Sequence, residues 1–339
     1  MVIILKKFEI TKIYYEPDIL DYPLGIKLFE KYKDIEKVPI ESHNNIPELR
    51  ANSNKDFVKM KSYLIIGTRK SLKWTPNNKI SDYLVPYTSS GCMSMCLYCY
   101  LVCNYNKCSY LRIFVNREQM LENIIRKVEK SDIDLVLEIG SNSDLILEET
   151  ITGNLSWTIK EFVKNTTKGK LTFPTKFHMV DSILDLDHQN RIIPRVSVNP
   201  KSIIQKIELG TSNLDERIDA INKLASAGYP VGILVAPIIF VPNWKKLYKD
   251  LIVYLSKKLS DEAKEKIFFE VIFMTYSFVH NAINTEAFPN SPILFSKELM
   301  TGRGKGKYTY KNELKAEGTL YISSLLKKYF KDNEIKYIV

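Results

Sequence analysis

The sequence predicts an α/β protein whose central part is built from six repeated βα units. Two observations predict this class: short runs of β-branched and aromatic residues recur from residue 82 onward, and amphipathic stretches of helical period separate them. This alternation is typical of a parallel sheet, because each crossover between parallel strands is long enough to hold a helix. The chain has no internal repeat other than this βα period.

The predicted strands are bounded by turn residues and rich in apolar side chains. Six of them cannot close an eight-stranded (β/α)8 barrel, so we expect a partial (β/α)6 barrel of the TIM type, with the site on the loops after the strands' carboxyl ends. The strands cover Asp82–Thr88, Leu135–Gly140, Leu171–Phe177, Arg195–Asn199, Val231–Pro237 and Ile267–Met274.

The helices between the strands are predicted from their period and their end signals. In the third helix, Ser212 is the expected N-cap, and Asp215 and Glu216 lie in the first turn. Gly228 and Pro230 then mark the end of this helix. The predicted helices cover Arg117–Lys130, Leu155–Asn165, Leu214–Ala227 and Trp244–Lys258.

We expect the barrel to lie between an N-terminal extension packed on it and a C-terminal element, a β-hairpin plus a helix, on the substrate side. The polar stretch Glu41–Lys55 predicts a loop. The three parts are residues 1–80, 81–290 and 291–339. Outside the barrel we expect a helix near Ile26–Tyr32, a strand at Tyr63–Gly67, and a final helix from about Glu313 to Phe330.

The composition predicts a cytoplasmic protein with a polyanionic partner. Of 339 residues, 45% are hydrophobic and 26% are charged, as in ordinary globular proteins. No apolar run reaches the length of a membrane span, and Met1–Lys7 lacks the pattern of an export signal, so we expect no membrane contact. The net charge of +10 favours a nucleic-acid partner. The chain is also rich in Asn, Ile, Lys and Tyr, a bias of AT-rich genomes, which explains part of this basicity without function.

Three cysteines in Cys92-Met-Ser-Met-Cys96-Leu-Tyr-Cys99 have the spacing of an iron-sulfur cluster with one open iron. Electron-transfer ferredoxins use four thiolates per cubane, whereas three leave one iron available to the amino and carboxylate groups of a small molecule. The CxxxCxxC spacing, with Tyr98 before the third cysteine, resembles the signature of radical S-adenosylmethionine (SAM) enzymes. We therefore predict a [4Fe-4S] cluster on these cysteines and SAM as the second cofactor.

A structural zinc site is the alternative for this segment, because Cys103 and Cys108 follow closely. Zinc sites usually show two CxxC pairs or a CxxH partner, and neither is present here. A disulfide framework is disfavoured in a large chain without an export signal. Cys103 and Cys108 are expected to be ordinary thiols on the loop after the cluster. The four histidines are all far away in sequence, at His43, His178, His188 and His280.

Several short segments together make the chain similar to one family. The most specific are Cys96-x-Tyr-Cys-Tyr-Leu101 and Thr175-Lys-Phe-His178. On these segments the chain resembles the spore photoproduct lyases, radical SAM enzymes that reverse a thymine dimer in bacterial spore DNA. The resemblance implies the partial barrel of radical SAM enzymes and damaged DNA as substrate. We also expect a monomeric enzyme that takes its electron from a flavodoxin or a ferredoxin. The other matching segments are Tyr22-Pro-Leu-Gly25, Ile66-Gly-Thr-Arg-Lys70, Gly91-Cys-Met93, Ala227-Gly-Tyr-Pro230, Val235-Ala-Pro237 and Gly306-Lys-Tyr308.

The resemblance also implies which residues surround the two cofactors. Lys176, Ser143 and Ser197 match positions around the methionine end of SAM, where an ammonium and two hydroxyls can bind its carboxylate and amino groups. Asn199 and Asp144 are further candidates for the same moiety. Without the resemblance, the simpler interpretation is that Lys176 is a surface lysine and that Ser143 and Ser197 are ordinary serines at strand ends.

The hydrogen donor that quenches the product radical departs from the family pattern. Tyr98 and Tyr100 match the tyrosines that assist this step, but Ser141 stands where the family has its donor cysteine. Serine is a poor hydrogen-atom donor because its O–H bond is much stronger than an S–H bond. Three explanations remain: an engineered Cys-to-Ser change, donation by Cys103 or Cys108, or different radical chemistry. Because the flanking residues differ too, natural divergence is favoured.

The substrate side also departs from the pattern. The family places an arginine and a tyrosine on a C-terminal hairpin that contacts the lesion, and this chain has Gly302 and Arg303 there. Met274 and Thr275 likewise replace a histidine and an arginine of the family. A solvated basic turn is the simpler interpretation of this Gly/Lys run. The predicted nucleic-acid contacts are Arg303, Lys305, Lys307 and Tyr308, with Tyr310 as a second aromatic candidate.

The sequence therefore predicts a radical SAM lyase of the DNA photoproduct repair type, which cleaves SAM reductively and abstracts hydrogen from a thymine dimer lesion. Two alternatives stay open. One is radical chemistry on a different nucleic-acid substrate. The other is a zinc- or cluster-bearing DNA-binding homologue that has lost catalysis, with Ser141 as a mark of that loss.

Overall fold

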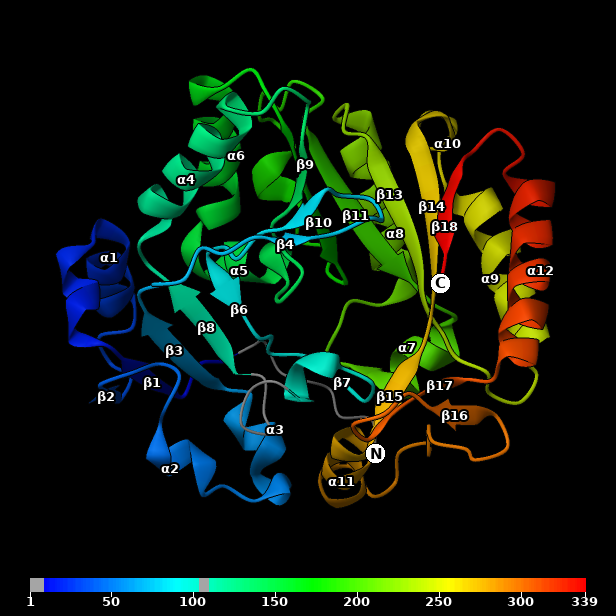
Figure 1. Cartoon of the computed structure of the whole chain (residues 1–339), viewed down its shortest axis with the longest axis horizontal. Coiled ribbons are helices and arrows are strands. Elements are labelled where there is room, and N and C mark those ends of the chain that lie inside the picture. The colour runs from blue at the N-terminus through cyan, green and yellow to red at the C-terminus, as the bar shows by residue number, and fades with distance from the viewer. Residues whose placement is uncertain (1–8, 104–109) are drawn as a thin grey trace.

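An eight-stranded sheet, curled into a half-barrel, forms the centre of the computed structural model, which describes residues 9–103 and 110–339 (Figure 1). Its order is β18-β14-β13-β11-β10-β9-β5-β4, and all neighbours are parallel except the β4–β5 pair. The strands are β4 (Thr75–Pro76), β5 (Tyr83–Leu84), β9 (Val136–Glu138), β10 (Lys170–Thr175), β11 (Ile192–Val198), β13 (Val231–Ile238), β14 (Ile267–Phe273) and β18 (Ile335–Ile338).

The predicted partial barrel is confirmed, since all six predicted strands lie in this sheet in chain order. The first strand was predicted too long. Tyr83 and Leu84 pair with β9, but the chain then leaves the half-barrel, and β6 (Ser89–Ser90) joins a different sheet. Two further strands, β4 and β18, extend the half-barrel at its edges.

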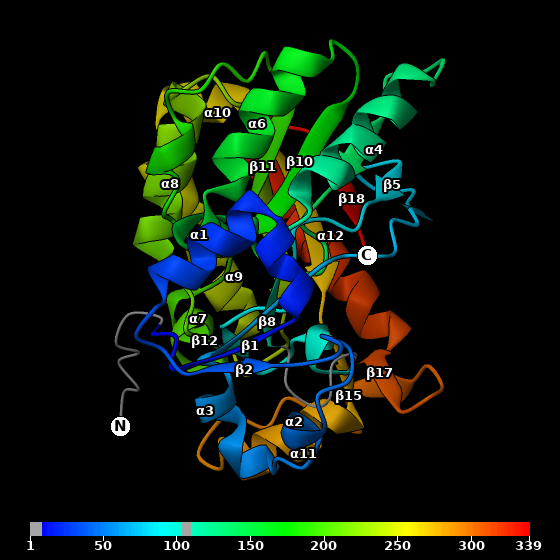
Figure 2. The ribbon, with the colours of Figure 1, turned by 90° about the vertical axis from the view of Figure 1, so that its left-hand side faces the viewer.

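Helices cover the outer face of the half-barrel, as Figure 2 shows for α4, α6 and α8 beside β10 and β11. The four predicted helices are confirmed. Four shorter helices were missed, because their apolar patterns span too few turns to show a helical period. The helices from residue 117 onward are α4 (Arg117–Glu129), α5 (Leu145–Thr152), α6 (Asn154–Asn165), α7 (Lys201–Ile207), α8 (Leu214–Ser226), α9 (Trp244–Lys258), α10 (Asp261–Lys266), α11 (Phe278–Ala287) and α12 (Asn312–Tyr329).

The N-cap of α8 is Asn213 and not the predicted Ser212. The Asn213 side chain accepts a hydrogen bond from the Glu216 backbone N–H at 3.0 Å, and the Glu216 carboxylate accepts one from the Asn213 N–H at 2.8 Å. This reciprocal capping box satisfies two donors at once. The Ser212 hydroxyl is used elsewhere, at 2.7 Å from Nδ1 of His178.

A second sheet, of five strands, belongs to the N-terminal part of the chain and has the order β2-β1-β3-β8-β6. Its strand β3 pairs with β8, which lies after the cysteine segment in sequence, and β6 pairs antiparallel with β8. The cysteine segment therefore begins where the two sheets meet. The remaining bounds are β1 (Lys12–Tyr15), α1 (Pro23–Lys31), β2 (Lys37–Pro39), β3 (Tyr63–Gly67) and β8 (Leu111–Phe114).

The polar stretch Glu41–Lys55 is not entirely a loop, as the sequence predicted. It contains the short helix α2 (Pro47–Arg50) and most of a 3-10 turn, and helix α3 (Phe57–Met60) follows. Pro47 starts α2 at a position where a missing N–H is tolerated. Ile46 and Leu49 are buried in the core, so tertiary packing holds this weakly periodic segment.

The C-terminal hairpin and helix are present as predicted. Strands β16 (Met300–Gly302) and β17 (Lys307–Tyr310) form the hairpin, and β15 (Thr275–Ser277) pairs with β17 on its other side. Helix α12 packs against α9, where the Tyr321 hydroxyl donates to the Lys245 carbonyl at 3.0 Å. Among the residues that the structure describes, no helix is both long and apolar enough to cross a membrane.

Candidate functional site

A cavity of about 290 Å³ lies at the carboxyl ends of the half-barrel strands, between these ends and the cysteine segment. Met274 and Thr275, which follow β14, form part of its wall. The three-cysteine motif and most of the other predicted site residues line it together. They are Cys92, Cys96, Cys99, Tyr98, Tyr100, Ser141, Ser143, Lys176 and Ser197. Asn199 and the four hairpin residues lie outside this wall.

The backbone of the cysteine segment is fixed by a short antiparallel pair. Strand β7 (Met95–Cys96) pairs with β12 (Glu208–Leu209), and Cys96 faces Glu208 in this register. The Leu97 N–H donates to the Ile207 carbonyl at 3.0 Å, and the Cys99 N–H turns back to the Cys96 carbonyl at 3.0 Å. The second and third cysteines are therefore presented on a turn anchored to the half-barrel.

Three side chains from distant parts of the chain bind carbonyl groups of this segment. Lys61 Nζ donates to the Cys92 carbonyl at 2.7 Å. Asn284 Nδ2 donates to the Leu97 carbonyl at 2.8 Å, and His280 Nε2 lies 2.9 Å from the Cys99 carbonyl. His280 and Asn284 are one helical turn apart on α11, so one helix holds two positions of the segment.

His280 therefore belongs to the surroundings of this site, which the sequence analysis did not predict. It is far away in sequence, but the fold buries it, at 4% exposure, against the cysteine segment. Burial lowers the pKa of His280 below its usual value, although the contact with the Cys99 carbonyl raises it in part. The neutral ring donates to that carbonyl and acts as a support for the segment. Sequence spacing contains no signal for a contact across this many residues.

The three thiols fit an iron-sulfur cluster better than a single metal ion. They are free and half-buried around one cavity. Burial raises the pKa of Cys92 to about 11 and that of Cys96 well above its usual range, so binding an iron cation would offset the cost of their ionisation. Within residues 9–103 and 110–339, no three His, Cys, Asp or Glu side chains converge on one point as ligands of one ion. A cubane takes its thiolates on separate irons, so its three cysteines need not meet at one point.

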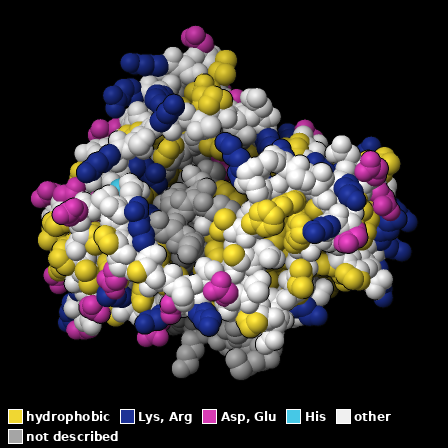
Figure 3. Space-filling model, turned by 60° about the horizontal axis from the view of Figure 1, so that its bottom comes forward, with side chains coloured by type: hydrophobic (Ala, Val, Ile, Leu, Met, Phe, Trp, Pro, Cys, Tyr) yellow, Lys and Arg dark blue, Asp and Glu magenta, His cyan; other side chains and the backbone are white. Residues whose placement is uncertain are grey.

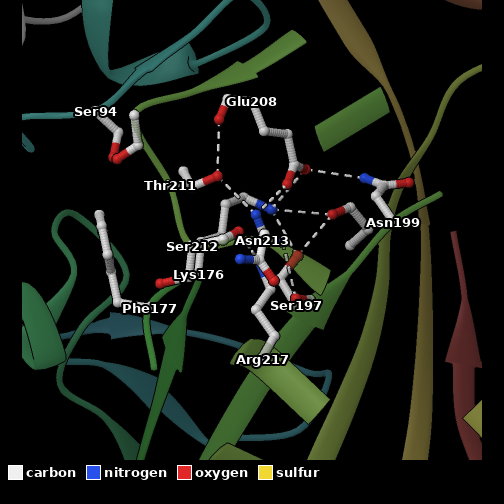
Figure 4. Close-up of polar contacts among 12 residues, drawn as sticks. Ser94, Lys176, Phe177, Ser197, Asn199, Glu208, Thr211, Ser212, Asn213 and Arg217 are labelled. Atoms are coloured by element: carbon white, nitrogen blue, oxygen red, sulfur yellow. Dashed lines mark hydrogen bonds and ion pairs between the residues drawn. The ribbon is translucent and has the colours of Figure 1, made fainter. Parts of the chain in front are cut away.

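Lys176 reaches from the end of β10 into the cavity and binds three oxygens. Its Nζ donates to Ser197 Oγ at 2.5 Å, to Glu208 Oε1 at 3.1 Å and to the Ala236 carbonyl at 3.1 Å. Figure 4 shows this ammonium and the guanidinium of Arg217 pointing at the same carboxylate. The Ser197 hydroxyl in turn donates to the Ala236 carbonyl at 2.8 Å. Lys176 is therefore a fixed cation in the wall of the cavity.

Glu208 is the centre of this polar network and was missed by the sequence analysis. Its carboxylate accepts from Lys176, from Arg217 Nη2 at 2.7 Å, and from Asn199 Nδ2 at 2.9 Å. The Tyr98 hydroxyl also donates to it. Burial alone would raise the pKa of Glu208, but the two cations and these hydrogen bonds lower it to about 2. The carboxylate stays ionised and joins the cysteine segment to the lysine.

Arg217 was missed as well, although the sequence held a signal for it. It is fully buried on α8, where it lies three residues after Leu214 and next to Ile218 on the apolar stripe. A charged residue on the apolar face of a predicted helix indicates a buried ion pair. Its guanidinium also donates to the Ser197 carbonyl at 3.0 Å and thereby supports the strand end that carries this serine.

The two tyrosines of the cysteine segment have different environments. Tyr98 is half-buried beside Glu208, and the loss of solvent around its hydroxyl raises its pKa well above the usual value. Tyr100 is half exposed, at 51%, and its hydroxyl donates to the Ser141 carbonyl. Ser141 and Tyr100 therefore stand side by side in the cavity wall. The side chain of Cys103 and the whole of Cys108 lie outside the described residues.

The remaining SAM-side candidates differ in how much of their hydrogen bonding is already used. Ser143 lines the cavity and accepts from Ser89 Oγ at 2.7 Å. Asn199 is fully buried behind the wall and is bound by Glu208 and by Tyr248. Asp144 lines the cavity, but its carboxylate caps α5 and accepts from the Lys176 N–H at 2.8 Å. Asn199 and Asp144 therefore both have structural roles in this conformation.

The hairpin residues lie next to the cavity and not in it. Arg303, Lys305 and Lys307 are exposed, and Lys305 has a positive φ of 50° in the turn. Tyr308 is held edge-on by two phenylalanine rings, at centroid distances of 4.7 and 5.1 Å. Tyr310 is buried in the core, where its hydroxyl accepts from the Phe240 N–H, so it is not available to stack on a base.

The half-barrel and the three-thiolate segment at its mouth define the class of radical SAM enzymes. Within this class the comparisons with known proteins agree on one family. The sequence profile described as "Spore photoproduct lyase" matches residues 8–339. The chain belongs to the spore photoproduct lyase family.

Curated relatives and solved structures are similar over nearly the full chain. The spore photoproduct lyase of Bacillus subtilis (strain 168) is 32% identical over 96% of this chain and 97% of its own. That of Clostridium acetobutylicum is 30% identical over 97% and 98%. A solved spore photoproduct lyase complexed with dinucleoside spore photoproduct is 29% identical, with a TM-score of 0.91 over 98% of this chain and 100% of that one. A cysteine variant of such a lyase, with bound AdoMet and dinucleoside spore photoproduct, is 28% identical with a TM-score of 0.91 over the same shares.

Proposed function

We propose that this chain reverses spore photoproduct in DNA by radical SAM chemistry, with a [4Fe-4S] cluster on Cys92, Cys96 and Cys99. The observation that carries the proposal is the meeting of these three thiols with Lys176 in one cavity at the strands' carboxyl ends. Family membership over the whole chain supports the substrate, because relatives of this length and fold bind dinucleoside spore photoproduct.

When bound, a cluster with SAM on its open iron supplies an electron to the sulfonium and so a 5′-deoxyadenosyl radical that abstracts hydrogen from the lesion. The chain's own residues bind and orient. Lys176 offers an ammonium to the SAM carboxylate, and Ser143 and Ser197 offer hydroxyls. Asn199 acts on the same moiety only indirectly: it donates to Glu208 at 2.9 Å, and Glu208 accepts from Lys176 at 3.1 Å. Leu234, Ile272 and Phe273 line the cavity with apolar surface that excludes water from the radical.

The quenching step is where this chain differs from the family pattern. We propose that Ser141 occupies the position of the usual donor cysteine by natural divergence, and that Tyr98 and Tyr100 serve hydrogen transfer. Tyr100 is the candidate that faces the substrate, because it is half exposed in the cavity wall and its hydroxyl touches the Ser141 backbone. Donation by Cys103 or Cys108 remains the competing route.

Ser141 also favours a second candidate function, radical chemistry on a different nucleic-acid lesion. A third candidate, a catalytically impaired DNA-binding homologue, leaves the buried Lys176–Glu208 pair unexplained, since a buried ion pair at a strand end is costly to keep without use. The basic hairpin, with Arg303, Lys305, Lys307 and the partly covered Tyr308, suits a nucleic-acid substrate under each of these candidates.

The deciding experiment is an anaerobic assay of reconstituted protein with SAM, dithionite and dinucleotide spore photoproduct. We expect cluster absorbance, 5′-deoxyadenosine, and thymines returned from the photoproduct. Stoichiometric zinc without reductive SAM cleavage would exclude the enzyme. SAM cleavage without any returned thymine, on the dinucleotide and on photoproduct-bearing DNA, would instead support the different-substrate candidate.

We further propose a cytoplasmic monomer that receives electrons from a flavodoxin or a ferredoxin. Free thiols at the site support a reducing compartment. We propose three parts of the chain. Residues 1–80 are an extension packed on the barrel, residues 81–290 are the radical SAM barrel, and residues 291–339 are the hairpin and helix on the substrate side. The position of the hairpin beside the cavity supports the last assignment.

A further inference from the structure

Phe278 is an exposed aromatic residue at the edge of the candidate site and is not part of the cavity wall. Its side chain is 60% exposed, and it is the first residue of helix α11. A single exposed apolar side chain is ordinary, but here the next residue, Val279, is exposed as well, at 39%, so the start of α11 presents a small apolar surface. The position is defined by the backbone, because the Phe278 N–H donates to the Gly306 carbonyl at 3.2 Å.

The ring of Phe278 rests on the hairpin turn. It meets Tyr308 edge-on at 5.1 Å between centroids and an interplanar angle of 82°. A Cβ on Gly306 would approach the Phe278 ring to 3.2 Å, so the absence of a side chain at Gly306 permits the close contact between the ring and the turn. One edge of the ring is therefore supported, and the rest of its surface is open to solvent. A supported aromatic ring of this kind loses little conformational freedom when a flat partner stacks on it.

Three cationic side chains belong to the hairpin turn that this ring contacts. Lys307 is the register partner of Ser277, the residue directly before Phe278. Arg303 and Lys305 lie in the same turn and are exposed. None of these three side chains forms an ion pair with another part of the chain that the structure describes. We call Phe278, Arg303, Lys305 and Lys307 the hairpin patch. Figure 3 shows lysine and arginine side chains beside exposed apolar ones on this lower face of the molecule.

The hairpin patch is physically continuous with the cavity. Thr275 lines the cavity, and strand β15 runs from it to Ser277, so Phe278 lies about 10 Å along the chain from the wall. That length corresponds to roughly three base steps of DNA at 3.4 Å each. His280, in the same first turn of α11, points the other way to the Cys99 carbonyl. The helix start therefore carries one side chain toward the cluster segment and one toward the outside.

We propose that Phe278 stacks on a nucleobase that flanks the damaged unit in the cavity, while the three cations of the hairpin patch bind the adjoining phosphates. The inference rests on the proposed function, in that the cavity holds a nucleic-acid lesion. An aromatic platform with cations on either side is the arrangement that binds unstacked bases of a strand. A damaged, weakly paired site exposes such bases at low cost.

Binding by the reconstituted full chain tests this inference, measured by fluorescence anisotropy with a single-stranded oligonucleotide that carries spore photoproduct. Phe278→Ala is expected to weaken this binding roughly 5- to 150-fold, the range for one base on one aromatic ring. Binding of the dinucleoside photoproduct, which has no flanking base, is expected to stay unchanged. Phe278→Trp should restore oligonucleotide binding. Leu320→Ala, which removes another apolar side chain exposed at 73%, is the matched control and should bind as the unaltered chain does.

The cations are tested by salt dependence. Lys305→Ala should weaken oligonucleotide binding and reduce the slope of log affinity against log salt by about one, whereas Phe278→Ala should leave the slope as it is. Unchanged oligonucleotide affinity in Phe278→Ala would overturn the inference alone. An equal loss of affinity of Phe278→Ala for the dinucleoside would also overturn it. The same holds if Phe278→Ala reacts more slowly with a flavodoxin donor but not with dithionite. An unaltered chain that neither binds nor repairs photoproduct DNA would overturn the proposed function and this inference together.

Discussion

Glu208 and Cys96 face each other in the antiparallel pair of β12 and β7, so the residue whose carboxylate binds Lys176 is also the backbone partner of a predicted cluster ligand. This single relationship connects the cysteine segment to the lysine that we propose as a SAM ligand. A displacement of β12 would move the cysteine turn and the lysine together.

Glu208→Gln should destabilise the protein strongly, because it leaves the buried guanidinium of Arg217 and the ammonium of Lys176 without their carboxylate. Removing one partner of a buried ion pair costs about 3–5 kcal/mol. Urea unfolding measures this. The matched control is Asp215→Asn, which removes the acid from an ion pair with Lys201 whose side chains are 50% and 54% exposed and should cost below about 1 kcal/mol. Equal effects of the two changes would contradict the central role of Glu208.

Stability should fall in acid through the same carboxylate. The pKa of Glu208 is lowered from 4.5 to about 2 in the folded protein, so its contribution is complete above pH 4.5 and is lost as the pH falls toward 2. The shift corresponds to about 3 kcal/mol. The difference in unfolding free energy between the unaltered chain and Glu208→Gln should therefore shrink from pH 7 to pH 3. A difference that stays constant over this range would speak against the depressed pKa.

Cys96→Ala should abolish both cluster absorbance and reductive SAM cleavage, since two thiolates do not hold a site-differentiated cubane. Anaerobic reconstitution, iron and sulfide analysis, and 5′-deoxyadenosine formation measure this. Cys103→Ala and Cys108→Ala are the controls and should keep the cluster. Loss of the cluster in either control, with retention in Cys96→Ala, would show that the ligand set was assigned wrongly.

Lys176→Met should weaken SAM binding at least tenfold and leave the cluster assembled. A hydrogen bond to a charged group contributes about 1.5–3 kcal/mol, and the methionine side chain keeps the length of the lysine without its charge. Equilibrium binding of SAM to the reconstituted protein gives the affinity, and the cluster spectrum gives the control. Lys201→Met, at an exposed lysine, should bind SAM normally. SAM affinity that is unaffected at Lys176 would remove this residue from the SAM site.

Ser141→Cys should increase the fraction of photoproduct that returns to thymine and decrease aberrant adducts, because an S–H bond donates a hydrogen atom to a carbon radical more readily than an O–H bond. Product analysis after a dinucleotide photoproduct assay, beside the unaltered chain, measures both fractions. Ser324→Cys, at an exposed serine of α12, is the control for the added thiol. If the unaltered chain already gives clean repair that Tyr100→Phe abolishes, Tyr100 and not position 141 serves the quenching step.

Most of the half-barrel could be predicted because its information is local. Strands β10, β11, β13 and β14 are apolar runs bounded by turn residues, and α8 and α9 have a full helical period. Short elements such as α7 carry fewer than two turns of pattern and could not be found. The predicted strand Asp82–Thr88 is divided between two sheets, and this division could not be predicted from the sequence. Strand pairing depends on neighbours far away in the chain.

By itself, the sequence determined the three-cysteine spacing, the order of βα units and the resemblance that named the SAM-side residues. These are properties of adjacent residues, and their chemistry does not depend on what surrounds them. Only the tertiary structure decided that Glu208 and Arg217 form the centre of the site, that His280 supports Cys99, and that Tyr308 is covered while Phe278 is exposed. The physical reason is that burial and ion pairing are set by contacts between segments distant in sequence, and no local pattern records those contacts.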